Sequence, residues 1–149
     1  MRKGPHPINR KLCLIHNAFK EQRNRRLLRY DLTSSQMDVM VFLHLNQGKV
    51  IYQKEIEKWL QLKNPTVTGI LNRLEEKGFI SRTTNEQDKR YRRIALTEKG
   101  IAVLEEIGDE LVSRDKKLYS CMTEEEREKM EELLDRILHN LKESEEKEC

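Results

Sequence analysis

Apolar residues recur at intervals of three or four residues at both ends of the chain, the spacing of one narrow stripe on a helix. The first stripe predicts a helix that ends near Tyr30, and it consists of Ile8, Leu12, Ile15 and Phe19. Thr97 is positioned to cap a long helix whose apolar side contains Ile101, Leu104, Ile107, Leu111, Val112 and Leu118. A final helix is predicted after a capping box at Thr123, and its stripe consists of Met130, Leu134, Ile137 and Leu141.

The middle of the chain begins with a second capping-box pattern. Thr33 can accept a hydrogen bond at a helix start, and Gln36 can reach back to it. The residues that follow, as far as Leu45, are nearly all apolar, which predicts a buried helix. Gly48 fits the stop of that helix.

Two short amphipathic helices follow across a three-residue connection. Residues 53–60 form the first, with Ile56, Trp59 and Leu60 on one face. Asn64 is a good N-cap for the second helix, and Gly78 ends it. The buried side of the second helix is predicted to contain Val67, Ile70, Leu71 and Leu74. A helix pair with so short a turn is typical of a helix-turn-helix.

A predicted hairpin completes the pattern. Residues 79–84 and 90–96 read as strands, and the polar residues between them as a turn with Glu86, Asp88, Lys89 and Arg90 at its tip. The predicted fold class is mainly α with a small β-hairpin wing. We expect one domain over 1–149, with a winged helix-turn-helix lobe at 32–100 and helical regions at 1–31 and 101–149.

The amino-acid composition indicates that the chain has a protein partner. Only 36% of the residues are hydrophobic and 37% are charged, a thin core for 149 residues, so we expect apolar surface to be shared with a second chain. The net charge of +3 conceals an uneven distribution, because basic and acidic residues gather at opposite ends of the chain. Residues 1–30 carry nine Lys/Arg and one Glu, whereas residues 101–149 carry eight Lys/Arg and sixteen Asp/Glu. We expect the two ends to neutralise each other, partly between subunits.

Several classes of protein are excluded. The longest apolar run spans five residues from Val39, far short of the roughly twenty that a membrane helix needs. No signal sequence is visible, and three scattered cysteines form no disulfide framework, so we expect a cytoplasmic protein with no membrane partner. No phosphate-binding glycine loop or nucleophile–base pair is present. We therefore predict no enzymatic activity and no cofactor.

The second helix of the pair carries polar residues suited to reading DNA. Thr66, Thr68, Gly69, Asn72 and Arg73 fall on its exposed face, with Asn64 at its start. Threonine can donate, accept or offer a methyl group to thymine, and arginine can bind guanine or phosphate. Gly69 costs about 1 kcal/mol against alanine in a helix, which a close approach to another backbone or to DNA would explain. The alternative is an ordinary solvated face, because the same helix pair recurs in proteins that bind no DNA.

The residues at the hairpin tip favour DNA binding over an ordinary solvated face. Lys89 and Arg90, followed by Arg92 and Arg93, make a basic finger. An arginine at such a tip can enter the minor groove, where the potential is most negative. Asp88 would repel phosphate, so we interpret it as the ion-pair partner of a nearby arginine, Arg90 or Arg73.

The ordered set of motifs resembles the core of the MarR family of bacterial transcriptional regulators. The matching stretches are Leu32–Gln36, Asn64–Glu75, Lys77–Arg82, Asp88–Arg90 and Ile94–Gly100. The resemblance covers nearly half of the chain, and the flanking helices match by length and pattern only. It implies a DNA-binding regulator, a repressor controlled by a ligand, that binds a pseudo-palindromic double-stranded operator as a homodimer through its first and last helices.

The resemblance also implies roles for individual residues. Thr66, Thr68 and Asn72 would lie near base edges and Arg73 near a base or phosphate. In the wing, Arg90 would enter the minor groove and Asp88 would anchor it. The basic residues Arg23, Arg25, Arg26 and Arg29 either belong to the dimer interface or touch phosphates.

The resemblance also concerns the signal that such a regulator senses. The resemblance implies a small aromatic or anionic effector bound between the dimerisation helices and the winged lobe. Cys13 lies where a peroxide-sensing branch keeps its reactive thiol, but Asn17 and Leu27 replace the tyrosines of that branch, which favours an incidental cysteine. Cys13 and His16 supply only two metal ligands, whereas tetrahedral zinc needs three or four. A winged-helix module that binds protein instead of DNA is the other alternative.

Overall fold

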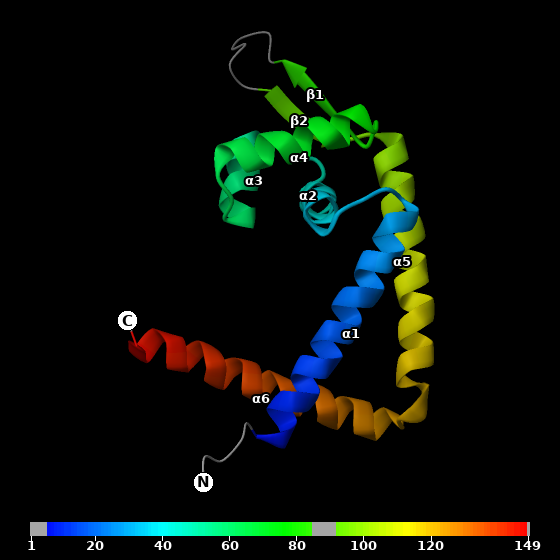
Figure 1. Cartoon of the computed structure of the whole chain (residues 1–149), viewed down its shortest axis with the longest axis vertical. Helices are drawn as coiled ribbons and strands as arrows, with labels where there is room; N and C mark the ends of the chain where they lie inside the picture. Colours follow the sequence, from blue (N-terminus) through cyan, green and yellow to red (C-terminus); the bar gives the residue numbers. More distant parts are fainter. Residues whose placement is uncertain (1–5, 85–91, 149) are drawn as a thin grey trace. The chain divides into compact units, whose positions relative to one another are not determined.

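The computed structural model describes residues 6–84 and 92–148, with side chains as far as Ser144 (Figure 1). The chain forms two compact units, Met1–Glu105 and Glu106–Cys149. The elements in order are α1 (Pro7–Arg29), α2 (Ser34–Leu45), α3 (Gln53–Leu60), α4 (Asn64–Glu76), β1 (Ile80–Thr84), β2 (Arg92–Leu96), α5 (Glu98–Leu118), the 3-10 turn η1 (Tyr119–Cys121) and α6 (Glu124–Glu148). The predicted class, mainly α with one hairpin, is confirmed.

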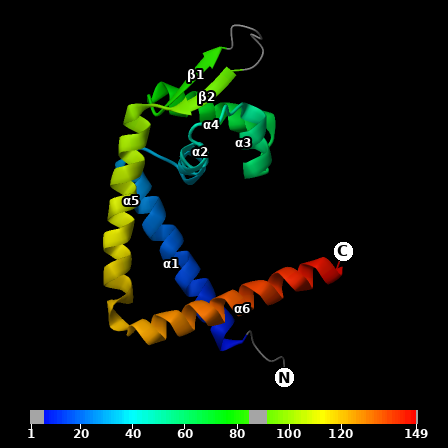
Figure 2. The same ribbon diagram turned by 180° about the vertical axis from the view of Figure 1, so that it is seen from behind.

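The first unit is organised around α2, α3, α4 and the hairpin, which gather into one cluster (Figure 2). Strands β1 and β2 pair antiparallel, with Ile80 opposite Leu96 and Thr84 opposite Arg92. Ile51 adds a single isolated antiparallel bridge to Ile94 of β2. Because β1 packs against α4 and β2 against both α2 and α3, the hairpin is tied to the helix pair.

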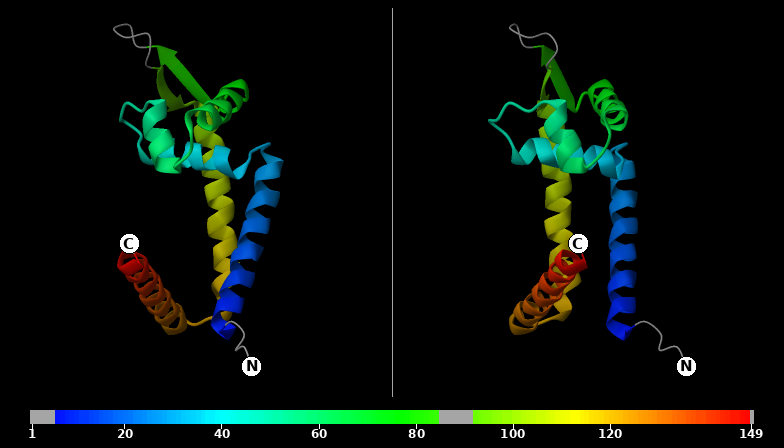
Figure 3. Two further views of the ribbon diagram at one scale, coloured as in Figure 1. Left: turned by 60° about the vertical axis from the view of Figure 1, so that its left-hand side comes forward. Right: turned by 90° about the vertical axis from the view of Figure 1, so that its left-hand side faces the viewer.

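Most of the core of this unit consists of apolar residues that the helical spacing singled out, but Trp59 of α3 is 47% exposed and Ile70 of α4 is only partly buried. Met40 of α2, Ile56 of α3 and three residues of α4, Val67, Leu71 and Leu74, are fully buried. The cluster of α2, α3 and α4 that they hold together is seen from two further sides in Figure 3. Burial of a large apolar side chain stabilises a fold by about 1.5–3 kcal/mol, so these residues fix how α3 and α4 cross.

The helix starts follow the predicted capping patterns with one exception. The Thr33 hydroxyl accepts from the Gln36 amide at 3.2 Å, and the Gln36 side chain accepts from the Thr33 amide at 3.1 Å. The same reciprocal pair joins Thr123 and Glu126 at 2.8 and 3.2 Å.

The exception is Asn64, predicted as the N-cap of α4. Lys63 occupies the cap position, its side chain makes no capping bond, and Asn64 is already helical. Both ends of the Asn64 amide have other partners, since its Nδ2 donates to Glu57 Oε1 at 2.7 Å and its Oδ1, the atom that a cap would use, accepts from the Thr68 hydroxyl at 3.5 Å. The bond to Glu57 links α4 to α3 across the turn.

The start of α5 is locked to the end of α4 through glycines. Gly78 has φ +76°, a left-handed backbone that suits glycine, and its carbonyl accepts from the Thr97 hydroxyl at 2.6 Å. The same hydroxyl caps α5 by accepting from the Gly100 amide at 3.1 Å. The backbone of Gly100 runs so close to the Phe79 carbonyl that an added Cβ would lie 2.2 Å from its oxygen.

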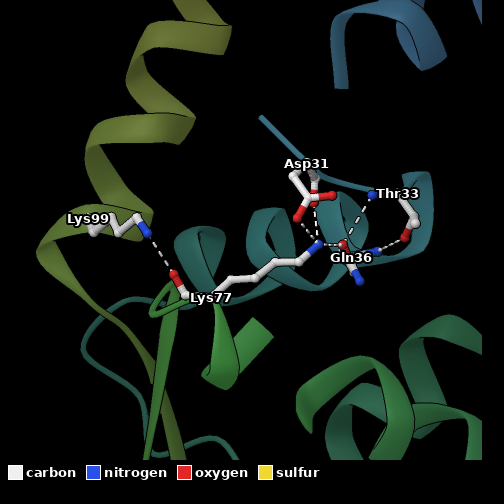
Figure 4. A network of polar contacts seen from close by, with 5 residues as sticks. All are labelled: Asp31, Thr33, Gln36, Lys77 and Lys99. Carbon is white, nitrogen blue, oxygen red and sulfur yellow. Dashed lines mark hydrogen bonds and ion pairs between the residues drawn. The ribbon is translucent and has the colours of Figure 1, made fainter. Parts of the chain in front are cut away.

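A polar joint connects four helices of the first unit, and it consists of Asp31, Thr33, Gln36, Lys77 and Lys99 (Figure 4). Lys77, just after α4, donates to the Asp31 carbonyl and to Gln36 Oε1 at 3.3 Å, and pairs with the Asp31 carboxylate at 3.2 Å. Lys99 of α5 donates to the Lys77 carbonyl at 2.7 Å. Gln36 is only 3% exposed, so its side-chain bonds are made away from water. The joint fixes the end of α4 against the α1–α2 corner.

The second unit leaves its apolar stripe uncovered. All six large apolar residues on one side of α6 are exposed: Met130, Leu133, Leu134, Ile137, Leu138 and Leu141. In the first unit, α1 likewise exposes Ile8 and Ile15. Neither unit by itself buries the apolar surface that the helical spacing marks on α6 and at the start of α1.

Candidate nucleic-acid interface

Helix α4 has two distinct faces. Its apolar face is buried in the core, as described above, and its other face carries the residues predicted from the sequence to read DNA. Thr66, Gly69, Asn72 and Arg73 are exposed, whereas Thr68 is partly buried. The exposed residues are small, polar or cationic, which suits close approach to a polyanion.

Thr68 and Asn64 are joined to α3 by a small network. Gln53 Nε2 donates to Thr68 Oγ1 at 2.8 Å and to Glu57 Oε1 at 3.0 Å. The Thr68 hydroxyl in turn donates to Asn64 Oδ1 at 3.5 Å. These bonds fix the first turn of α4 against α3, so Thr68 and Asn64 position the helix as well as lining its surface.

A second cluster joins α4 to the wing. Arg82 of β1 donates from Nε to Glu75 Oε2 at 2.8 Å and from Nη2 to Asn72 Oδ1 at 2.7 Å, and Nη2 also contacts Glu75. The hydrogen bond from the Arg82 guanidinium is the main cause that lowers the pKa of Glu75 below its ordinary value, so Glu75 is ionised at neutral pH. Asn72 and Arg82 are thus brought together, a contact that the sequence did not predict.

The wing strands carry basic side chains outward. Arg92 and Arg93 of β2 are exposed, opposite the exposed Thr84 and Thr83 of β1. A groove runs from this base of the wing to the start of α3, and it is lined by Tyr52, Gln53, Lys54, Glu55, Glu57, Asn64, Arg82, Arg92 and Ile94. The predicted tip residues Asp88, Lys89 and Arg90 lie outside the described residues, so their roles stay predictions.

Part of the positive charge on α1 is balanced within the first unit. Arg23 forms an ion pair with Asp38 of α2, and Arg25 pairs with Glu21 at 3.1 Å, one turn away. Exposed pairs of this kind contribute about 0–1 kcal/mol each, but they reduce the charge that α1 presents. Whether α1 also meets the acidic C-terminal region stays a prediction.

The residues considered for sensing do not assemble into a site. Cys13 is exposed on α1. In residues 6–84 and 92–148, no group of three or more His, Cys, Asp and Glu side chains could hold a metal ion. Over the same residues, no helix combines the length and apolar character needed to cross a bilayer.

Sequence reasoning missed the residues that support the interface from behind. Gln53 and Glu57 stand four residues apart on α3, a spacing that places both on the side facing α4. That spacing is a weak signal, because it also fits a solvated helix face. For Arg82 and Lys77 no signal existed, since their partners lie on elements that only the tertiary fold brings near.

The helix pair, the wing that follows it and the polar exposed face of α4 together define the winged helix-turn-helix class. Comparison with known proteins leads to the same class. The model of the MarR family matches residues 32–91. PecS of Dickeya dadantii, an HTH-type transcriptional regulator, is 30% identical over 76% of this chain and 69% of its own. YwoH of Bacillus subtilis, also named as an HTH-type transcriptional regulator, is 34% identical over 83% of this chain and 85% of its own.

Solved structures extend the likeness to the whole fold. MepR of Staphylococcus aureus, described as a transcription regulator of the multidrug efflux pump MepA, superposes with a TM-score of 0.82 at 29% identity, covering 91% of this chain and 99% of that one. A MepR–DNA complex superposes with a TM-score of 0.73 at 32% identity, over 86% and 95% of the two chains. The chain belongs to the MarR family and is a DNA-binding transcriptional regulator, not an enzyme.

Proposed function

We propose that the chain is a ligand-responsive repressor that binds a pseudo-palindromic operator as a homodimer. One observation carries this proposal: α4 buries Val67, Leu71 and Leu74 on one side and exposes Thr66, Gly69, Asn72 and Arg73 on the other. A recognition helix needs this division, because its exposed side must enter the major groove while its other side is fixed to the lobe. The likeness to MepR in complex with DNA supports the same placement.

In this proposal each exposed residue of α4 has a task. Thr66, near the start of the helix, meets a base edge through its hydroxyl or its methyl group. Arg73, two turns further on, binds a guanine or a phosphate. Thr68 shares its hydroxyl with Gln53 and Asn64, so its methyl group is the part available to a base.

The wing contributes the minor-groove contact. Arg92 and Arg93 lie exposed on β2, so the strand that leads to the tip already carries positive charge. Arg90 would insert into the minor groove and Lys89 would meet the adjacent phosphates, with Asp88 orienting the arginine through an ion pair. A cationic wing beside α4 would place both contacts on one side of the duplex.

Dimerisation is supported by the uncovered apolar stripes. The exposed residues of α6 and α1 would be buried against a second copy of the chain. The basic first segment and the acidic last segment would then attract each other across the interface. Two-fold symmetry would set the two α4 helices about one DNA turn apart, roughly 34 Å.

A small aromatic or anionic molecule bound between the dimerisation helices and the winged lobe would change the spacing of the two α4 helices. Such a change lowers operator affinity only if the molecule prefers one spacing over the other.

Selection of duplexes from a random DNA library with the purified full chain tests this function. We expect an enriched consensus of two inverted half-sites, centred about 10 base pairs apart. A consensus with a single half-site would contradict binding as a symmetric dimer. If no sequence were enriched, the DNA-binding proposal would be wrong and the protein-interaction module would replace it.

A further inference from the structure

We propose that Arg82 is a positioning residue that turns the amide of Asn72, so that Asn72 meets DNA through its NH₂ group and reads a base that offers acceptors only. The inference rests on the proposed function, because it requires α4 to lie in the major groove. It adds a determinant of sequence preference that lies on β1, outside the recognition helix.

The geometry of the Arg82 side chain carries the first step. Its Nη2 lies 2.7 Å from Asn72 Oδ1, and its Nε lies 2.8 Å from Glu75 Oε2. The Arg82 side chain is only 13% exposed, whereas Asn72 on α4 is exposed. Two partners one helical turn apart on α4 are therefore bound by one guanidinium that is itself packed against the protein.

Chemistry decides which end of the amide faces outward. A guanidinium has N–H donors and no acceptor, so only the oxygen of the Asn72 amide can turn toward Arg82. The NH₂ group then points away from β1 and is the end that meets a ligand. An asparagine that reads adenine must present its oxygen and nitrogen side by side, donating to N7 and accepting from N6. The contact with Arg82 opposes that arrangement.

A side chain that presents only hydrogen-bond donors fits bases other than adenine. In the major groove guanine offers N7 and O6 and thymine offers O4, all of them acceptors. Asn72 is therefore expected to prefer guanine or thymine at the position that it contacts. Glu75 neutralises Arg82 locally, since the two are ion-paired, so Arg82 acts through Asn72 and not as a phosphate contact.

The test compares the DNA consensus of four full-length proteins: wild type, Asn72→Ala, Arg82→Lys and the double variant. Arg82→Lys keeps the charge but loses the fork that joins Asn72 to Glu75. We expect both single variants to lose about tenfold of the preference at the same guanine or thymine position, and the double variant to lose no more. The salt dependence of binding is expected to stay unchanged for Arg82→Lys, as no phosphate contact is removed.

Arg136→Lys is the matched control, because it makes the same change on an exposed residue of α6, outside α4 and the wing. It is expected to leave this position of the consensus unchanged. Should Arg82→Lys fold poorly by circular dichroism, Glu75→Gln loosens Arg82 through its other partner and is expected to weaken the same position.

Three results would overturn the inference. In the first, Asn72→Ala loses a preference for adenine. In the second, the consensus changes in Asn72→Ala but not in Arg82→Lys. In the third, Asn72→Ala binds more weakly but its consensus stays the same. Failure of the proposed function would look different, since the wild-type protein itself would then enrich no sequence.

Discussion

Replacing Gly100 with alanine is expected to lower the free energy of unfolding by about 3 kcal/mol or more. The added Cβ would lie 2.2 Å from the Phe79 carbonyl oxygen and 3.1 Å from its carbon, and backbone atoms cannot rotate aside. That oxygen also accepts at 3.0 Å from the amide of Thr97, the residue just before α5, so moving it disturbs the bond that holds the start of α5 to Phe79. Chemical denaturation followed by circular dichroism, at one fixed protein concentration, measures the change.

Gly108→Ala is the control for this experiment because it makes the same substitution in the same helix. No described atom lies within 4 Å of a Cβ added at Gly108, so the variant is expected to gain about 1 kcal/mol from helix propensity. An unfolding midpoint of Gly100→Ala equal to that of the wild-type protein would mean that α5 does not approach Phe79 as closely as described.

The second large effect is expected at Gly69, where stability and DNA binding should move in opposite directions. Among the residues described, no atom lies within 4 Å of a Cβ added at Gly69, so packing within the protein does not require glycine there. Gly69→Ala should therefore raise the free energy of unfolding by about 1 kcal/mol. Because Gly69 lies on the exposed face of α4, the methyl group should lower operator affinity about tenfold by holding the helix away from the groove.

Denaturation and fluorescence anisotropy on the same protein preparations test both parts of this prediction. Gly108→Ala again serves as control, with the same gain in stability and no loss of operator affinity. A Gly69→Ala protein that is more stable and binds the operator as tightly as wild type would remove the reason for placing this face of α4 against DNA.

The parts of the fold that the sequence predicts are those that local chemistry decides. Thr33 and Gln36 form their capping box because both partners lie within one helical turn. Ile56 and Leu71 are buried because apolar spacing on a short helix leaves one face to pack. The class of the fold follows, since two such helices, a short turn and a hairpin allow few arrangements.

The contacts that sequence alone could not supply are those between elements. Arg82 meets Asn72 and Glu75 only because the register of β1 beside α4 places them together. The prediction for Asn64 fails for a related reason: Asn64 is already inside the helix, and its amide bonds to Glu57 of α3 and to the Thr68 hydroxyl. Propensity rules describe one element at a time, so they miss such contacts.

Charge patterning also needed the structure to be interpreted. The sequence assigns Arg23 to a dimer interface or to phosphates, yet its side chain pairs with Asp38 of α2 in the same chain. By contrast, the apolar stripe of α6 stays exposed, as expected of a surface meant for a second chain. The Arg23 pair shows that a basic residue of α1 can find its partner within the chain, whereas the exposed apolar stripe of α6 supports the proposal of a dimer.

Operator affinity across a salt series tests whether α4 and the wing bind a specific DNA sequence. Fluorescence anisotropy would compare the selected operator with a scrambled duplex for wild type, Arg73→Ala and Arg90→Ala, with Lys116→Ala on α5 as the control. We expect wild type to prefer the operator by at least about 1,000-fold, and each arginine variant to lose about 10- to 100-fold of that affinity. Equal affinity of wild type for both duplexes, or operator binding unchanged in both arginine variants, would contradict the account.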